Sequence, residues 1–97
     1  MADRSQGILL NSSIIIAHFR GQIDLFQLVS PDEPLFVPLV ALGELRKGAL
    51  KSANPPKHQA KITALLKIAA VALELDMPLA TRDAHFERID GLTVIKW

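Results

Sequence analysis

The sequence predicts a single α/β domain, residues 1–97, built on a small and mostly parallel β-sheet. Short apolar runs typical of buried strands alternate along the chain with segments whose apolar residues recur at helical spacing. Such alternation is typical of parallel sheets, whose strands are joined by helices. With 97 residues, 49% of them hydrophobic, the chain also has the size and composition of one domain with its own core.

The expected elements alternate from one end of the chain to the other. In order, they are strand 8–10, a helix from about Ser13, strand 35–37, helix 38–52, helix 57–75, strand 79–81, a helical turn at 84–89 and strand 92–95. We expect Gly21 to break the first helix in two and Ser12 or Ser13 to cap its start. The stretch from Lys57 to Leu75 contains no Gly or Pro, so we expect one helix of about 28 Å there.

Composition and charge narrow the function classes. The chain has no cysteine, no apolar run near the roughly 18 residues of a membrane span, and a polar N-terminus, so we expect a cytoplasmic protein without a membrane partner. No acidic residue lies between Glu44 and Glu74. The same interval contains the basic residues Arg46, Lys47, Lys51, Lys57, Lys61 and Lys67. This pattern fits either an RNA-backbone contact or two solvated helix faces.

Polar side chains follow two of the expected strands. Asn11 comes directly after strand 8–10, Asp83 follows strand 79–81, and Glu44 lies about one and a half turns into the helix after strand 35–37. Ligands of open parallel sheets bind beyond the carboxyl ends of the strands, so these three side chains could meet at one edge. Their oxygen atoms suit Mg²⁺ or Mn²⁺. Taken alone, Glu44 also fits a solvated helix residue, and Asp83 fits the cap of the turn at 84–88.

Four stretches in this order resemble the PIN domain, specifically the VapC-type toxins of bacterial toxin–antitoxin pairs. They are ILLNSSIIIAHFRG (8–21), VPLVALGELRKGALKS (37–52), IAAVALELDMPLATRDAHF (68–86) and GLTVIKW (91–97). The resemblance covers most of the chain and implies a three-layer α/β fold. It also implies a Mg²⁺- or Mn²⁺-dependent endoribonuclease with about four acidic side chains around the metal, a homodimer, and inhibition by a small antitoxin protein.

The resemblance carries over only in part at the site. Glu44 matches the family's helix glutamate and Asp83 matches its late aspartate, so these two are the implied metal ligands. Asn11 stands where the family has its first aspartate, and Leu65 stands where its third acidic residue is expected. The implied catalytic positions are therefore Asn11, Glu44 and Asp83. With two of the four acidic residues absent, we expect a nuclease homologue whose activity is lost or strongly reduced, and which binds Mg²⁺ or Mn²⁺ weakly or not at all.

The chain is also shorter than VapC-type domains usually are. Our hypothesis is that an internal deletion removed a central strand and helix and joined two helices into the long one at 57–75. Such a rod is expected to carry the chain away from its own sheet and to leave the apolar side of the helix exposed. Exchange of the C-terminal half between two copies would bury that apolar side again. We therefore expect a homodimer or higher oligomer, with domain exchange as one form of it.

Two other readings remain open. The chain could be a non-catalytic interaction module that binds an antitoxin or itself. It could also be an active nuclease that borrows metal ligands from a second subunit across an exchanged interface.

Overall fold

The computed structural model describes residues 4–43 and 58–97. Its strands and helices alternate as the sequence predicts. They are β1 (Ile8–Leu10), α1 (Ser12–Phe19), α2 (Leu25–Leu28), β2 (Leu35–Phe36), α4 (His58–Leu75), β3 (Leu79–Ala80), the 3₁₀ helix η1 (Ala84–Arg88) and β4 (Val94–Ile95). Residues 39–43 are also helical, and the remainder of the expected helix 38–52 lies outside the described residues.

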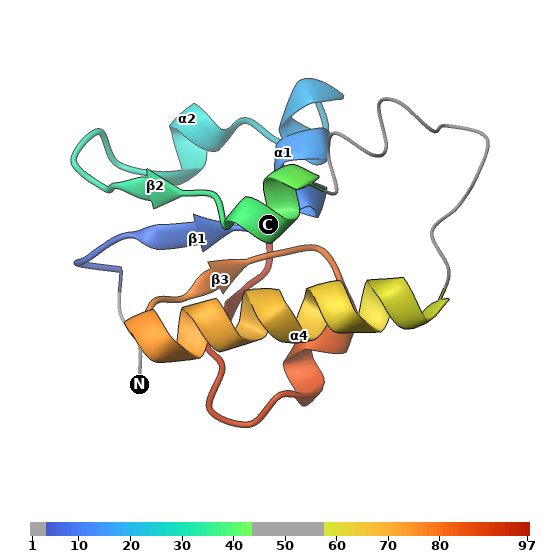
Figure 1. The fold of residues 1–97 in the computed structure, drawn as a ribbon. Coiled ribbons are helices and arrows are strands. Elements are labelled where there is room, and N and C mark those ends of the chain that lie inside the picture. The colour runs from blue at the N-terminus through green and yellow to red at the C-terminus, as the bar shows by residue number, and fades with distance from the viewer. Residues whose placement is uncertain (1–3, 44–57) are drawn as a thin grey trace.

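The four strands form one sheet in the order β2-β1-β3-β4, and every pairing in it is parallel (Figure 1). The small parallel sheet is therefore confirmed. All three residues of β1 are buried, as expected for a parallel strand that is covered on both faces. The chain adds β2 on one side of β1 and then β3 and β4 on the other side, so the strand order reverses between β1 and β3.

Helices cover both faces of the sheet. Successive side chains of a strand point to opposite faces, so a single strand contacts both helical layers. Ile8 and Leu10 of β1 belong to one core cluster with Ile14 of α1 and Leu25 of α2. Leu9, between them, belongs to a second cluster together with residues of α4 and η1. Figure 1 shows the same arrangement, with α1 and α2 on one side of the strands and α4 on the other. The α/β architecture thus has a helical layer on each side of the sheet.

Two turns with left-handed backbone geometry follow α1 and α4, which lie on opposite sides of the sheet. Gly21 has φ +74° and follows α1 before the chain enters α2, so the predicted break at Gly21 is confirmed. Asp76 has φ +52° and follows α4. The Met77 backbone N–H donates to the Ala72 carbonyl at 3.0 Å, which closes the last turn of α4 and directs the chain into β3.

Helix α4 runs without interruption from His58 to Leu75, which confirms the expected single long helix. No turn separates Ala64 from Ala69. Ile68 and Ala69 are buried in the cluster that contains Leu9 of the same chain. The expectation that this helix carries the chain away from its own sheet is therefore wrong, because its apolar face packs on that sheet. Domain exchange and the internal deletion stay predictions. Within the described ranges, no helix has the length and apolarity needed to cross a membrane.

Candidate functional site

Asn11 and Thr81 lie side by side at the carboxyl edge of the sheet. Leu10 pairs with Ala80 in the β1–β3 register, so the next residue of each strand continues that pairing. Asn11 Nδ2 donates a hydrogen bond to Thr81 Oγ1 at 3.0 Å, and both side chains are buried. This bond lies between β1 and β3, where the strand order reverses and where ligands of open parallel sheets bind.

The Thr81 hydroxyl is the hydrogen-bonding centre of this edge. Its oxygen accepts from Asn11 Nδ2 at 3.0 Å and from the Asp83 backbone N–H at 3.1 Å, which uses both of its acceptor positions. Ser13 Oγ lies 3.3 Å away and itself accepts from the Arg82 backbone N–H at 3.0 Å. The Thr81 proton is therefore directed to Ser13, which joins α1 to the segment that follows β3.

Asn11 connects the end of β1 to the start of α1. It is the N-cap residue of α1 by backbone position, although its side chain makes no capping bond. The prediction that Ser12 or Ser13 caps this helix is wrong, since α1 begins at Ser12 and the Ser13 hydroxyl bonds to Thr81 and Arg82 instead. Asn11 Oδ1 is a buried oxygen without a hydrogen-bond partner in the described part of the chain. The side chain thus offers one neutral acceptor at the edge of the sheet.

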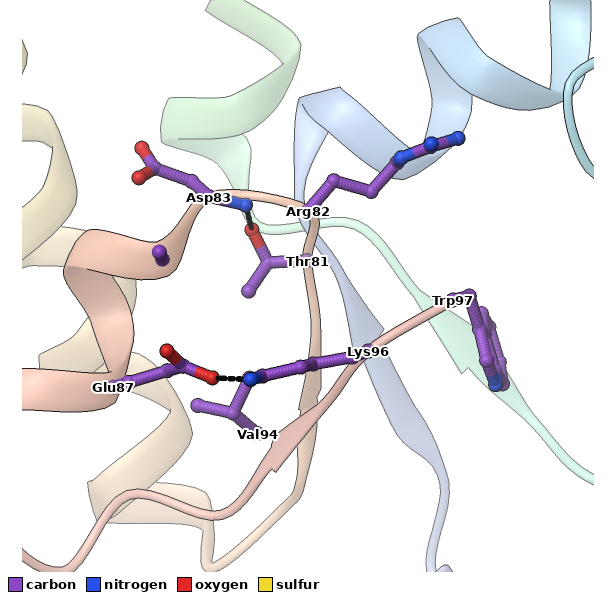
Figure 2. Close-up of a pocket in the computed structure, with 8 residues that line it drawn as sticks. Thr81, Arg82, Asp83, Glu87, Val94, Lys96 and Trp97 are labelled. Atoms are coloured by element: carbon purple, nitrogen blue, oxygen red, sulfur yellow. Dashed lines mark hydrogen bonds and ion pairs between the residues drawn. The ribbon is translucent and has the colours of Figure 1, made fainter.

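The Asp83 carboxylate is engaged in the turn that follows β3. Its Oδ1 accepts from the His85 backbone N–H at 2.9 Å and lies 2.7 Å from His85 Nδ1. Asp83 therefore caps η1, which was the alternative to a metal ligand that the sequence offered for this residue. Figure 2 shows the carboxylate directed away from the Thr81 hydroxyl, whereas the Asp83 backbone N–H points to it. Asn11 and Asp83 are therefore brought to the same hydroxyl, but by an amide side chain and a backbone group.

The described residues contain only part of the expected metal site. Glu44 lies outside the described residues, so its expected convergence with Asn11 and Asp83 stays a prediction. Within residues 4–43 and 58–97, no three His, Cys, Asp or Glu side chains gather closely enough to hold a cation. What remains is the single unpartnered oxygen of Asn11 and a carboxylate whose Oδ1 is already bonded to His85. In proteins, Mg²⁺ is usually held by one or two carboxylates together with water molecules and substrate phosphates.

A shallow open hollow lies beside this edge, between the ends of β3 and β4 (Figure 2). Its volume is about 270 Å³. Its lining residues are Thr81, Arg82, Asp83, Ala84, Glu87, Val94, Lys96 and Trp97. Glu87 and Lys96 form an ion pair in it, while the Arg82 side chain points away toward Gln22, whose Oε1 lies 3.4 Å from Arg82 Nη1. Opposite charges thus neutralise each other within the hollow.

Sequence reasoning missed Thr81 as the centre of the site. The position was visible, because a polar threonine ends the expected strand 79–81 and an asparagine directly follows the expected strand 8–10. What the sequence does not reveal is the register of β1 and β3, which places Asn11 and Thr81 side by side. Glu87 and Lys96 were missed for the same reason, since their pairing depends on how η1 folds back against β4.

The expected RNA-contacting residues fall mostly beyond the described part of the chain. Arg46, Lys47, Lys51 and Lys57 lie outside it, and the placement of the Lys61 side chain is likewise not described. Lys67 is exposed on α4. The basic surface therefore stays a prediction. Comparison of the chain with protein-family models, curated proteins and solved structures finds no match.

Proposed function

We propose that this chain is a PIN-like, VapC-type homologue of metal-dependent endoribonucleases whose nuclease activity is lost or strongly reduced. One observation carries the proposal. The strand order reverses between β1 and β3, and we call this place at the carboxyl edge of the sheet the switch point. The resemblance calls for a metal-binding aspartate there, but the chain has the neutral Asn11, whose amide group donates a hydrogen bond to Thr81. The parallel sheet with helices on both faces supports the fold that the proposal requires.

The proposed loss of nuclease activity follows from the smaller negative charge of the site. Compared with the family pattern, Asn11 and Leu65 remove two formal negative charges from the site. Leu65 is half-buried and packs against the core cluster that contains Ile68 and Leu9, so it shields that core from solvent and provides no oxygen atom for a metal. Glu44 and Asp83 could still hold a divalent ion weakly together with water. A bound ion would supply a Lewis acid, but a site with half its carboxylates is expected to hold one poorly.

The second candidate function is an interaction module that binds an antitoxin or a second copy of itself. Exposed apolar side chains favour it: Phe19 and Phe26 are each 81% exposed, and Leu39 is 82% exposed. The rings of Phe19 and Phe26 lie 5.8 and 5.5 Å from the ring of His18, which gathers three rings on the α1–α2 surface. In this reading the chain forms a homodimer or higher oligomer and titrates its partner without chemistry. RNA contact through the basic residues is compatible with either function.

Metal binding tests the proposal directly. Mn²⁺ is titrated calorimetrically into the wild-type protein, Asn11→Asp and Asn11→Ser. We expect weak or undetectable binding by the wild type and by Asn11→Ser, and at least about tenfold tighter binding by Asn11→Asp, because one carboxylate is restored at the switch point. Tight binding by the wild type that is lost in Asp83→Ala would contradict the proposal.

A further inference from the structure

Helix α4 presents an apolar flank to solvent beside the face that packs on the sheet. Ile62 is 44% exposed, Leu66 is 56% exposed and Leu73 is 42% exposed. Their spacing of four and then seven residues places them on one side of the helix. Isolated exposed leucines are ordinary on protein surfaces, but a stripe along three turns of one helix is a contiguous apolar surface. We call these three residues the α4 flank.

Two opposite charges border the α4 flank. Lys67 and Glu74 are exposed and lie seven residues apart, one next to each of the two leucines. Within the described part of the chain, neither forms an ion pair or a hydrogen bond. Seven residues of helix separate them by about 10 Å, which is too far for a direct contact with each other. Ala70, small and exposed, lies midway between them.

We propose that two copies of this chain pair through the α4 flank with their α4 helices antiparallel. With the two-fold axis at the midpoint of residues 66–73, Leu66 lies beside Leu73 of the partner subunit. Lys67 then lies within about 3 Å, along the axis, of the level of Glu74 of the partner subunit. In a parallel pair, whose two-fold axis runs along the helices, the charged residues of the two copies would lie on opposite sides of the contact, so Lys67 would not meet Glu74 of the partner subunit. The charge pattern therefore selects the antiparallel arrangement, and Ala70 near the crossing allows close approach.

The surface predicts a weak dimer. Three half-exposed aliphatic side chains and their borders cover well under the roughly 800 Å² per partner of a standard interface. We therefore expect dimerisation that depends on concentration and weakens with salt, because the exposed charge pairs are screened. This inference rests on the self-association that the proposed function includes, and it adds the surface and the orientation.

Sedimentation equilibrium at low salt tests the surface. The wild-type protein is compared with Leu66→Gln and with the matched variant Leu75→Gln, which changes a 49% exposed leucine on the opposite side of the same helix. We expect Leu66→Gln to weaken dimerisation at least about tenfold, since both copies lose apolar area, and Leu75→Gln to change it less than about twofold. Circular dichroism confirms that each variant is folded. A wild-type protein that stays monomeric up to about millimolar concentration would contradict both the inference and the proposed self-association.

Charge reversal tests the orientation. Lys67→Glu and Glu74→Lys are each expected to weaken the dimer several-fold at low salt, because each places like charges at both symmetry-related contacts. The double variant Lys67→Glu/Glu74→Lys restores opposite charges and is expected to recover wild-type affinity within about threefold. A dimer that is insensitive to all of these changes would overturn the inference and leave the proposed self-association standing. A double variant that is weaker than either single variant would overturn the antiparallel orientation.

Discussion

At the scale of single residues, the Thr81 hydroxyl connects three segments of the chain. It accepts from Asn11 after β1 and from the Asp83 backbone before η1, and it contacts Ser13 in α1. All of this occurs in a residue that is 1% exposed, where an unsatisfied donor has no water to replace its lost partner. The carboxyl edge of the sheet therefore depends on one buried oxygen atom.

Replacing that oxygen should cost stability. We expect Thr81→Val to lower the free energy of unfolding by about 1–3 kcal/mol, because the buried Asn11 Nδ2 group loses its acceptor while side-chain volume is kept. Urea denaturation measures the loss. Thr81→Ser keeps the hydroxyl and should recover part of it. Thr93→Val is the matched control, since the Thr93 hydroxyl forms no hydrogen bond within the described residues; a loss as large there would contradict the account.

The interactions of Glu33 predict how the stability of the protein changes at acidic pH. The Ser30 backbone N–H, which donates to its carboxylate at 2.7 Å, and the Arg4 guanidinium hold the pKa of Glu33 below its ordinary value. A carboxyl whose pKa is lowered by folding stabilises the protein above its unfolded-state pKa. That stabilisation is lost as the pH falls through the folded-state pKa.

The measurement is the urea midpoint as a function of pH. We expect Glu33→Gln to be less stable than the wild type at neutral pH, and the difference to shrink as the pH falls below the ordinary carboxyl range. Asp32→Asn is the control, because Asp32 lies in the same loop and forms no hydrogen bond or ion pair in the described part of the chain. A Glu33→Gln difference that grows toward acid would contradict the assignment.

At the scale of elements, α4 has one buried face and one exposed flank. Ile68 is 1% exposed within the core cluster of the sheet, whereas Ile62 is 44% exposed on the same helix. The two positions carry the same side chain, so they offer a matched comparison of burial.

We expect Ile68→Ala to lower the free energy of unfolding by about 2–5 kcal/mol, through lost apolar burial and the cavity left behind. Ile62→Ala should cost less than about 1 kcal/mol in dilute solution, where self-association does not contribute. Chemical denaturation of both variants measures the difference. Equal costs would show that α4 does not pack on the sheet through the face that contains Ile68.

The sequence pattern predicted the strands and helices of the described residues in their order, with α2 anticipated only as a part of the first helix beyond Gly21, because apolar runs, glycine and proline are local signals. It placed strand ends less well: the expected strands 35–37 and 92–95 are Leu35–Phe36 and Val94–Ile95. Strand ends depend on pairing with a neighbour, which no local pattern contains. The start of α1 agrees with the prediction, but its capping residue was mispredicted, because the Ser13 hydroxyl accepts from the distant Arg82 backbone N–H, a contact set by the sheet.

At the scale of the whole molecule, the sheet order explains which site residues could be foreseen. A chain that places β1 between β2 and β3 brings the residues after β1 and β3 together, so Asn11 and Asp83 were predicted at one edge. The direction of the Asp83 carboxylate could not be predicted, because it depends on the cap that Asp83 forms for η1. The N-terminal segment and the C-terminal residue also meet, since the Arg4 guanidinium lies 5.5 Å from the Trp97 ring. No local pattern indicates that contact.

The proposed function attributes the expected loss of phosphodiester cleavage to the neutral Asn11 at this edge of the sheet. RNA cleavage in the presence of Mn²⁺ tests it most directly, with the wild type, Glu44→Ala, Asp83→Ala and Asn11→Asp purified in parallel. We predict that the wild-type rate does not exceed the rates of Glu44→Ala and Asp83→Ala, and that Asn11→Asp exceeds the wild type if any variant does. Cleavage by the wild type that disappears in Glu44→Ala or Asp83→Ala would contradict the claim and identify an active nuclease.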